Sequence, residues 1–173
     1  MPKPRFSPET APPNSILCAS GHRSARVGGY TPEARAKLQQ FAEQQLMLLR
    51  PKQVISGMAI GWDTAVAQAA VYLGIPFIAA IPFPAQPSRW SPADIKTWIW
   101  LKEQAIHVHY SAKSYTPDAF QLRNIWTVDN SHLVLALHDG EPGGTANCLR
   151  YAKSVNREIL NTWAEWRAFQ PCQ

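Results

Sequence analysis

Short apolar runs alternate with helix-type segments along most of this chain, and this alternation limits the folds open to it more than any other feature. The runs occupy residues 16–19, 54–55, 77–81, 106–110, 133–137 and 158–160. Between successive runs lie segments whose apolar residues recur at helical spacing. A repeated strand and helix order, with several runs apolar throughout, predicts an α/β fold. We expect a mostly parallel sheet, helices on both faces and right-handed crossovers.

Two of the expected helices carry clear start signals. Thr31-Pro32-Glu33 combines a capping hydroxyl, a proline at the first helical position and an acid in the first turn. Ser91-Pro92 precedes the segment that carries Trp98 and Leu101. We therefore expect helices to begin at residues 32 and 92.

The chain has 173 residues, of which 46% are hydrophobic, so it can bury the core of one domain. We expect that domain over residues 15–163. Residues 1–14 contain five prolines and no apolar periodicity, which predicts an extended or disordered arm. Residues 164–173 are expected to form a C-terminal tail.

Several classes of protein are disfavoured. No apolar run is long enough to span a bilayer and the N-terminus lacks the apolar segment of a signal peptide, so we expect a cytoplasmic protein. Cys18, Cys148 and Cys172 form an odd, widely spaced set, which predicts reduced thiols. His107 and His109 alternate on an expected strand without a suitably spaced third ligand, so no metal is expected.

The formal charge of +5 and the isoelectric point near 9.3 mildly favour anionic partners. The Lys and Arg residues are scattered, however, and no basic run has the length of a nucleic-acid-binding tail. The tryptophans are expected mainly to pack in the core. Charge alone therefore does not identify the partner.

A glycine turn follows the apolar run 133–137. The chain breaks at Asp139-Gly140, turns through Pro142-Gly143-Gly144 and is expected to re-enter a helix capped by Thr145. Glycines let the backbone approach a ligand closely, and the first N–H groups of a helix have no partner within it, so phosphate is the natural ligand. The alternative is a tight connection that binds nothing.

Three further polar loops follow expected strands, at residues 20–23, 56–63 and 82–90. Because the carboxyl ends of parallel strands meet at one edge of the sheet, we expect these loops to converge on one site near the topological switch point. His22 and Arg23 are expected to contact the ligand there, and Arg23 is the better candidate for a phosphate.

Three aspartates each have two interpretations. Asp63 can bind a ribose hydroxyl or cap the helix that follows it. Asp139 can hold a ribose hydroxyl or a metal, or it can shape an Asx turn with Gly140. Asp129 lies late in its helix, where the dipole disfavours a carboxylate, so we expect it to pair with a turn amide or a basic side chain such as Arg123.

Several motifs, taken together and in order, resemble those of a known superfamily. They are Ser20-Gly21-His22-Arg23, the segment 55–63, Ala80-Ile81-Pro82-Phe83 with Gln86 and Trp90, Arg123-Asn124 with Val128-Asp129, and residues 139–147. This set resembles the YpsA-like (DUF1273) branch of the SLOG superfamily, which groups the Rossmann domain of DNA-processing protein A with the LOG-like phosphoribohydrolases. The resemblance implies a Rossmann-like three-layer sandwich with a nucleotide pocket, and often a homodimer or higher homo-oligomer.

The catalytic part of the resemblance is weaker. The phosphoribohydrolases share the Pro-Gly-Gly turn and an arginine that Arg123 matches, but Cys148 occupies the position of their glutamate. Cys148 shares a helical stripe with Leu149 and Ala152, so we expect it in the core. Without that carboxylate, hydrolysis of an N-glycosidic bond lacks its expected general acid or base.

The resemblance and the loops together predict a protein that binds a nucleotide or nucleotide-derived ligand, acting as a sensor or signalling module. A nucleoside monophosphate phosphoribohydrolase with Arg123 as catalytic residue is the first alternative, and a module that binds single-stranded nucleic acid is the second. No cofactor, metal or membrane partner is expected. The expected ligand-binding residues are Ser20, Gly21, His22, Arg23, Ser56, Gly57, Asp63, Pro82, Arg123, Asn124, Asp139, Gly140, Gly143, Gly144 and Thr145.

Overall fold

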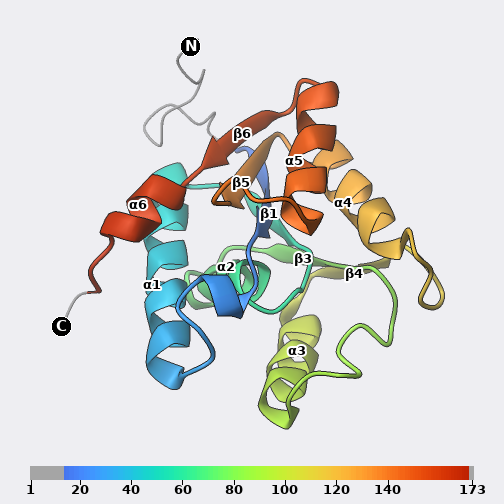
Figure 1. Ribbon diagram of the computed structural model, residues 1–173, viewed down its shortest axis with the longest axis horizontal. Helices are drawn as coiled ribbons and strands as arrows, with labels where there is room; N and C mark the ends of the chain where they lie inside the picture. The colour runs from blue at the N-terminus through green and yellow to red at the C-terminus, as the bar shows by residue number, and fades with distance from the viewer. Residues whose placement is uncertain (1–13, 172–173) are drawn as a thin grey trace.

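The computed structural model describes residues 14–171 and contains a six-stranded sheet in the order β4-β3-β2-β1-β5-β6 (Figure 1). The strands are β1 (Ile16–Gly21), β2 (Gln53–Ser56), β3 (Phe77–Ile81), β4 (His107–Tyr110), β5 (Leu133–Leu137) and β6 (Glu158–Asn161). All five neighbouring pairs are parallel. The α/β, Rossmann-like prediction is confirmed.

Helices cover both faces of this sheet (Figure 1). They are α1 (Pro32–Leu49), α2 (Trp62–Tyr72), α3 (Pro92–Gln104), α4 (Ala119–Asp129), α5 (Gly144–Ser154) and α6 (Trp163–Ala168), with a 3₁₀ turn η1 (Ser24–Arg26). Successive side chains along a strand point to opposite faces of the sheet, because the backbone is pleated. Leu133 and Leu135 join the cluster beneath α1, α2, α3 and α6, whereas Val134 joins the cluster beneath α4 and α5. Two cores, one on each face, complete the three layers.

Helix starts agree with two sequence expectations and correct two others. Thr31 Oγ1 accepts the Ala34 N–H at 3.2 Å, which confirms the predicted cap. Ser91 Oγ accepts the Asp94 N–H at 3.2 Å, and the helices begin at residues 32 and 92 as expected. The predicted cap Thr145 is wrong, because α5 begins at Gly144 after Gly143. Of the two interpretations of Asp63, the helix cap is excluded, because α2 begins at Trp62 after Gly61. Glycine occupies both cap positions at backbone angles that other residues rarely adopt.

The end of the described chain packs on the domain. The segment expected as a C-terminal tail begins with α6, whose Trp166 is 8% exposed and lies with its ring centroid 5.4 Å from that of Phe41. Residues 1–13, which hold nearly all of the expected N-terminal arm, and Cys172 lie outside the described residues. No helix among residues 14–171 is long and apolar enough to cross a bilayer.

The sheet changes direction of growth at β1. Strands β2, β3 and β4 extend it on one side of β1, and the chain then returns to place β5 and β6 on the other side. The β1 and β5 pairing runs from Leu17 opposite Leu133 to Gly21 opposite Leu137. The crevice beyond Gly21 and Leu137 is therefore the topological switch point, where sheets of this type bind ligands.

Candidate functional site

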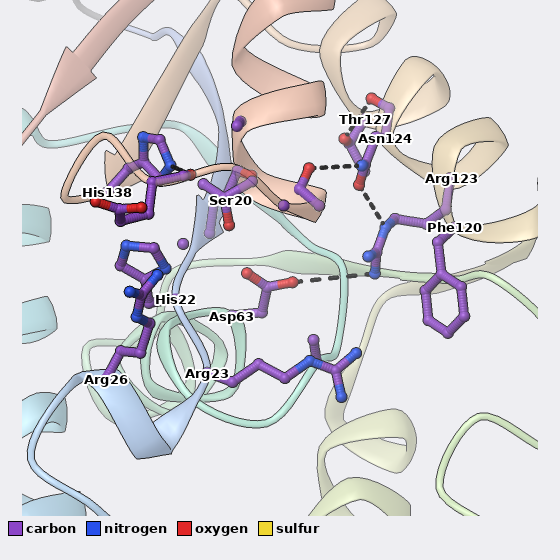
Figure 2. A pocket seen from close by; sticks show the side chains of 18 of the residues that line it. Ser20, His22, Arg23, Arg26, Asp63, Phe120, Arg123, Asn124, Thr127 and His138 are labelled. Carbon is purple, nitrogen blue, oxygen red and sulfur yellow. Dashed lines mark hydrogen bonds and ion pairs between the residues drawn. The ribbon is translucent and has the colours of Figure 1, made fainter.

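A polar cavity of about 460 Å³ opens at the switch point (Figure 2). It is bounded by the end of β1 and η1, the first turn of α2, one face of α4, and the connection from β5 into α5. Its lining residues are Ala19, Ser20, Gly21, His22, Arg23, Arg26, Ala59, Asp63, Phe120, Arg123, Asn124, Thr127, His138, Glu141, Pro142, Gly143, Gly144, Thr145 and Ala146. The loops after β1, β2 and β5 thus converge on one site, as expected, but the fourth expected loop, residues 82–90, does not line it.

A buried ion pair forms one wall of the cavity. Arg123 Nη1 lies 3.9 Å from Asp63 Oδ2, and the same guanidinium donates to the Gly57 carbonyl and, through Nε, to Asn124 Oδ1 at 3.0 Å (Figure 2). Burial raises the pKa of Asp63, an effect that Arg123 opposes, and burial lowers the pKa of Arg123, which Asp63 opposes. The guanidinium is thereby held in one orientation beside the cavity.

Two further arginines come from the turn after β1. Arg23 is exposed and its side chain extends across the cavity mouth below Asp63, towards Arg123 (Figure 2). Arg26 is half-exposed and its Nη1 lies 3.5 Å from Asp139 Oδ2. Three guanidinium groups therefore border one cavity, against the carboxylates of Asp63 and Glu141 in its lining. This balance favours an anionic ligand.

The glycine turn lies across the cavity from these arginines. Gly143 has a φ of 151° and no side chain caps α5, so the first N–H groups of this helix have no partner within it. Asn124 Nδ2 donates to the Gly144 carbonyl at 3.4 Å, which ties the turn to α4. A Cβ at Gly144 would meet no atom within 4 Å. The turn thus presents open backbone to the cavity, as an anion site requires.

His22 and Asp139 connect the ends of β1 and β5. The Asp139 N–H donates to His22 Nε2 at 3.0 Å, and Asp139 Oδ1 accepts the Glu141 N–H at 3.0 Å. The second bond is the Asx turn considered for Asp139, and it lowers the pKa of that carboxyl. Burial lowers the pKa of His22, which agrees with its acceptor role. Asp139 itself does not line the cavity.

Five expected site residues lie outside the lining: Ser56, Gly57, Pro82, Asp139 and Gly140. Ser56 is fully buried beneath it, where its Oγ donates to the Asp63 carbonyl at 2.8 Å. Gly57 acts from behind, since its carbonyl holds Arg123. The other ten expected residues, from Ser20 to Thr145, all line the cavity.

Sequence reasoning missed Arg26, Phe120, Thr127, His138 and Glu141. Helical spacing is the signal that could have found Phe120 and Thr127. On α4, Phe120 lies three residues before Arg123 and Thr127 lies four residues after it, so all three share one face of the helix. His138 follows β5 as His22 follows β1, so strand order could have indicated it.

Two individual expectations are settled by the packing of α4 against α5. Cys148 is 1% exposed in the core, as predicted, and burial raises the pKa of its thiol. Asp129 does not pair with Arg123 or a turn amide; it accepts the Tyr151 hydroxyl at 2.8 Å instead.

The strand order and the polar cavity at the switch point define a Rossmann-like α/β protein. Within that class, the chain belongs to the DNA recombination-mediator protein A family, whose model matches residues 19–170. The SLOG superfamily assignment is thereby confirmed, and the YpsA-like branch stays a prediction. A curated relative, the uncharacterized SPbeta prophage-derived protein YoqJ of Bacillus subtilis, is 33% identical over 119 residues, covering 58% of this chain and 69% of the relative.

Three solved structures share the fold at low identity. DNA processing protein A of Helicobacter pylori, described for its single-stranded DNA binding mode, has a TM-score of 0.61 and 16% identity over 85% of this chain and 64% of that one. DNA processing protein A of Streptococcus pneumoniae has a TM-score of 0.57 and 18% identity over 84% of this chain, and this chain spans 49% of its length. TM1055 has a TM-score of 0.57 and 15% identity over 84% of this chain and 72% of that one.

Proposed function

We propose that the protein binds a nucleotide or nucleotide-derived ligand in the cavity at the switch point. One observation carries this proposal: Arg23, Arg26 and Arg123 border the same cavity as the open glycine turn at Gly143-Gly144. Guanidinium groups and free helix-end N–H groups are the two kinds of donor that proteins use most for phosphate. Their convergence supports a phosphate-bearing ligand more strongly than either feature alone.

The rest of the lining suits a nucleoside. The carboxylate of Asp63 can accept hydrogen bonds from ribose hydroxyls, and the half-buried Phe120 ring can contact a base. A cavity of about 460 Å³ lies within the usual range for small-molecule sites. A nucleotide in this cavity would place its phosphate at the Gly143-Gly144 turn and its base towards Phe120 on α4. We propose that the protein then acts as a sensor or signalling module.

Hydrolysis of the ligand is the less supported alternative. Cys148 stands where the phosphoribohydrolases carry a glutamate, and its buried side chain does not line the cavity. Asp63 is the nearest substitute, yet it is paired with Arg123. We therefore propose binding without turnover. Incubation with nucleoside monophosphates checks this, and release of free base that Arg123→Ala abolishes would overturn it.

Single-stranded nucleic acid is a second candidate because a second hollow adjoins the first. It has a volume of about 750 Å³, and Arg23 lines both. The second hollow adds the exposed Arg89 and the rings of Tyr30 and Trp90, which are groups that bind backbone phosphates and stack on bases. Its acidic residue, Asp94, is already paired with Arg35. A single nucleic-acid strand could thus run from one hollow to the other, in line with the DNA binding described for the Helicobacter pylori relative.

Calorimetric titration separates the two candidates. The full chain is titrated with nucleoside monophosphates, inorganic phosphate and a short oligodeoxythymidylate at two salt concentrations. The small-ligand proposal predicts that Gly144→Val abolishes monophosphate binding while Arg89→Ala and Trp90→Ala leave it unchanged. Strand binding predicts that all three variants weaken the oligonucleotide, with a steep loss of affinity in salt. Failure of every nucleotide to bind the parent chain would contradict both.

A further inference from the structure

Three groups that can bind a metal lie together where β1 and β5 end. They are His22, His138 and Asp139, and they offer ligand atoms that all lie within 4.8 Å of one another. The strand register explains the grouping. Gly21 and Leu137 are paired neighbours on parallel strands, so the residues that follow each of them leave the sheet side by side. The cluster is therefore a product of the backbone topology.

One ring nitrogen of His138 already has a backbone partner. His138 Nε2 lies 2.8 Å from the Glu141 carbonyl oxygen. A carbonyl only accepts, so Nε2 carries the hydrogen and Nδ1 keeps its lone pair. Ligating histidines characteristically donate their other ring N–H to such a carbonyl, which fixes the tautomer and the ring orientation. The Trp163 ring stands edge-on to His22, with centroids 5.6 Å apart, and adds an apolar wall.

His22 Nε2 faces both the carboxylate and the backbone N–H of Asp139. Asp139 Oδ1 lies 2.7 Å from His22 Nε2, while the Asp139 N–H donates to that same nitrogen at 3.0 Å. If Nε2 accepts from the N–H, its lone pair and the carboxylate oxygen repel. If Nε2 carries a hydrogen instead, it donates to Oδ1, and the Asp139 N–H then loses its acceptor. One carboxylate and two imidazoles thus converge with more acceptor capacity than the residues themselves satisfy.

We propose that His22, His138 and Asp139 bind a divalent transition-metal ion, and that zinc fits the set best. Two imidazoles and one carboxylate make a three-ligand site, which leaves a fourth position open for water or another ligand. Both histidines line the cavity, whereas Asp139 lies just outside its lining. Binding has a cost, since the bond from the Asp139 N–H to His22 must open and the Arg26 guanidinium, 3.5 Å from Asp139 Oδ2, opposes a second positive charge. The inference does not depend on the nucleotide proposal.

The test is metal binding by the full chain without nucleotide. The protein is freed of metal with a chelator and titrated with Zn²⁺ by calorimetry, and Co²⁺ absorption spectra report the ligand type. We expect one ion per chain. Asp139→Asn and His138→Ala should each weaken binding at least about tenfold, since even residues behind the ligands carry effects of that size. Arg26→Ala should tighten it, because the competing charge is removed.

His107→Ala is the matched control, since His107 is exposed on β4 at the far edge of the sheet and should leave the affinity unchanged. Circular dichroism checks that each variant folds. Asp139→Asn covers the case in which His138→Ala fails to fold, because it keeps the size of the side chain and changes only the carboxylate. The proposal is overturned if the parent binds no Zn²⁺, if Asp139→Asn binds like the parent, or if the Co²⁺ spectrum shows thiolate charge-transfer bands.

Discussion

Arg123 and Asp63 face each other across 3.9 Å, with side chains only 9% and 7% exposed, although they lie on different helices. Arg123 comes from α4 on one face of the sheet and Asp63 from the first turn of α2 on the other. The pair therefore joins the two helical layers at the point where the sheet ends. It also places opposite charges next to each other beside a cavity that we expect to hold an anion.

Removing one member of this pair should be far more harmful than removing both charges. Arg123→Met leaves the Asp63 carboxylate buried without its cation, which should lower the free energy of unfolding by about 3–5 kcal/mol. The double variant with Asp63→Asn should lose less than the sum of the single losses. Urea unfolding of the three variants measures this coupling, and strictly additive losses would show that the two groups act independently.

Gly57→Ala should displace the Arg123 guanidinium, which Gly57 contacts on the side away from the cavity. A Cβ at this position would overlap the Arg123 guanidinium and the Asp63 carboxylate. We expect a loss of about 1–3 kcal/mol in unfolding free energy, as for other overpacked sites, together with weaker nucleotide binding. Gly144→Ala is the control for stability, because its Cβ meets no atom within 4 Å. Equal stability of the two variants would contradict the contact.

Gly144→Val should abolish nucleotide binding without unfolding the chain. The folded protein has room for the side chain, so the loss would come from the ligand's side of the turn. Thr145→Ala should retain binding, and it should cost less stability than a lost helix cap, because Thr145 does not cap α5. Calorimetric titration and circular dichroism of both variants measure this. Normal ligand binding by Gly144→Val would assign the turn a purely connecting role.

Cys18 and Cys148 should resist thiol reagents until the protein unfolds. Both are buried, and burial raises the pKa of Cys18 to about 12 and that of Cys148 above its usual value, so neither forms the reactive thiolate at neutral pH. The measurement is labelling of a Cys172→Ser variant with a chromogenic disulfide, in native buffer and in urea. Fast labelling of Cys148 in native buffer would contradict this prediction and would make Cys148 a candidate nucleophile.

Acidification should destabilise the protein from about pH 6.5 downward. Burial lowers the pKa of His109 and of His22, so the unfolded chain binds protons that the folded chain does not. The contribution of these histidines to stability is therefore fully present above their unfolded pKa of about 6.5, and it is lost as the pH falls from there through their folded pKa values. His109→Phe keeps the stack on Trp126, whose centroid lies 3.9 Å away, and should make the stability less dependent on pH between 6.5 and the folded pKa of His109. Chemical unfolding across that range tests it.

The layers of this fold could be predicted from the sequence because short apolar runs and helical spacing are local signals. Leu133 to Leu137 is apolar at every position, and all five residues are buried between two layers of helices. The caps at Thr31 and Ser91 were equally local. The cap at Thr145 was not, because the preference for a hydroxyl gave way to Gly143, whose φ of 151° only glycine adopts readily.

The parts of the site that could not be predicted depend on packing between distant elements. Ser56 ends a strand beside a glycine, as ligand-binding serines do, but its hydroxyl turns back to the Asp63 carbonyl of α2. The partner of Asp129 is Tyr151, 22 residues away on a helix whose rotation against α4 no local pattern reveals. Arg26 and His138 reach the cavity only because β1 lies next to β5.

The pairing of β1 with β5 also determines when the cavity can exist during synthesis. Ser20 and Ala136 are register partners, yet the ribosome makes the second of them 116 residues after the first. A nascent chain that has released β1 to β4 already holds Arg23 and Asp63, but it has no neighbour for the free edge of β1 and no glycine turn. The complete cavity therefore forms only after β5 and the turn that leads into α5 have emerged.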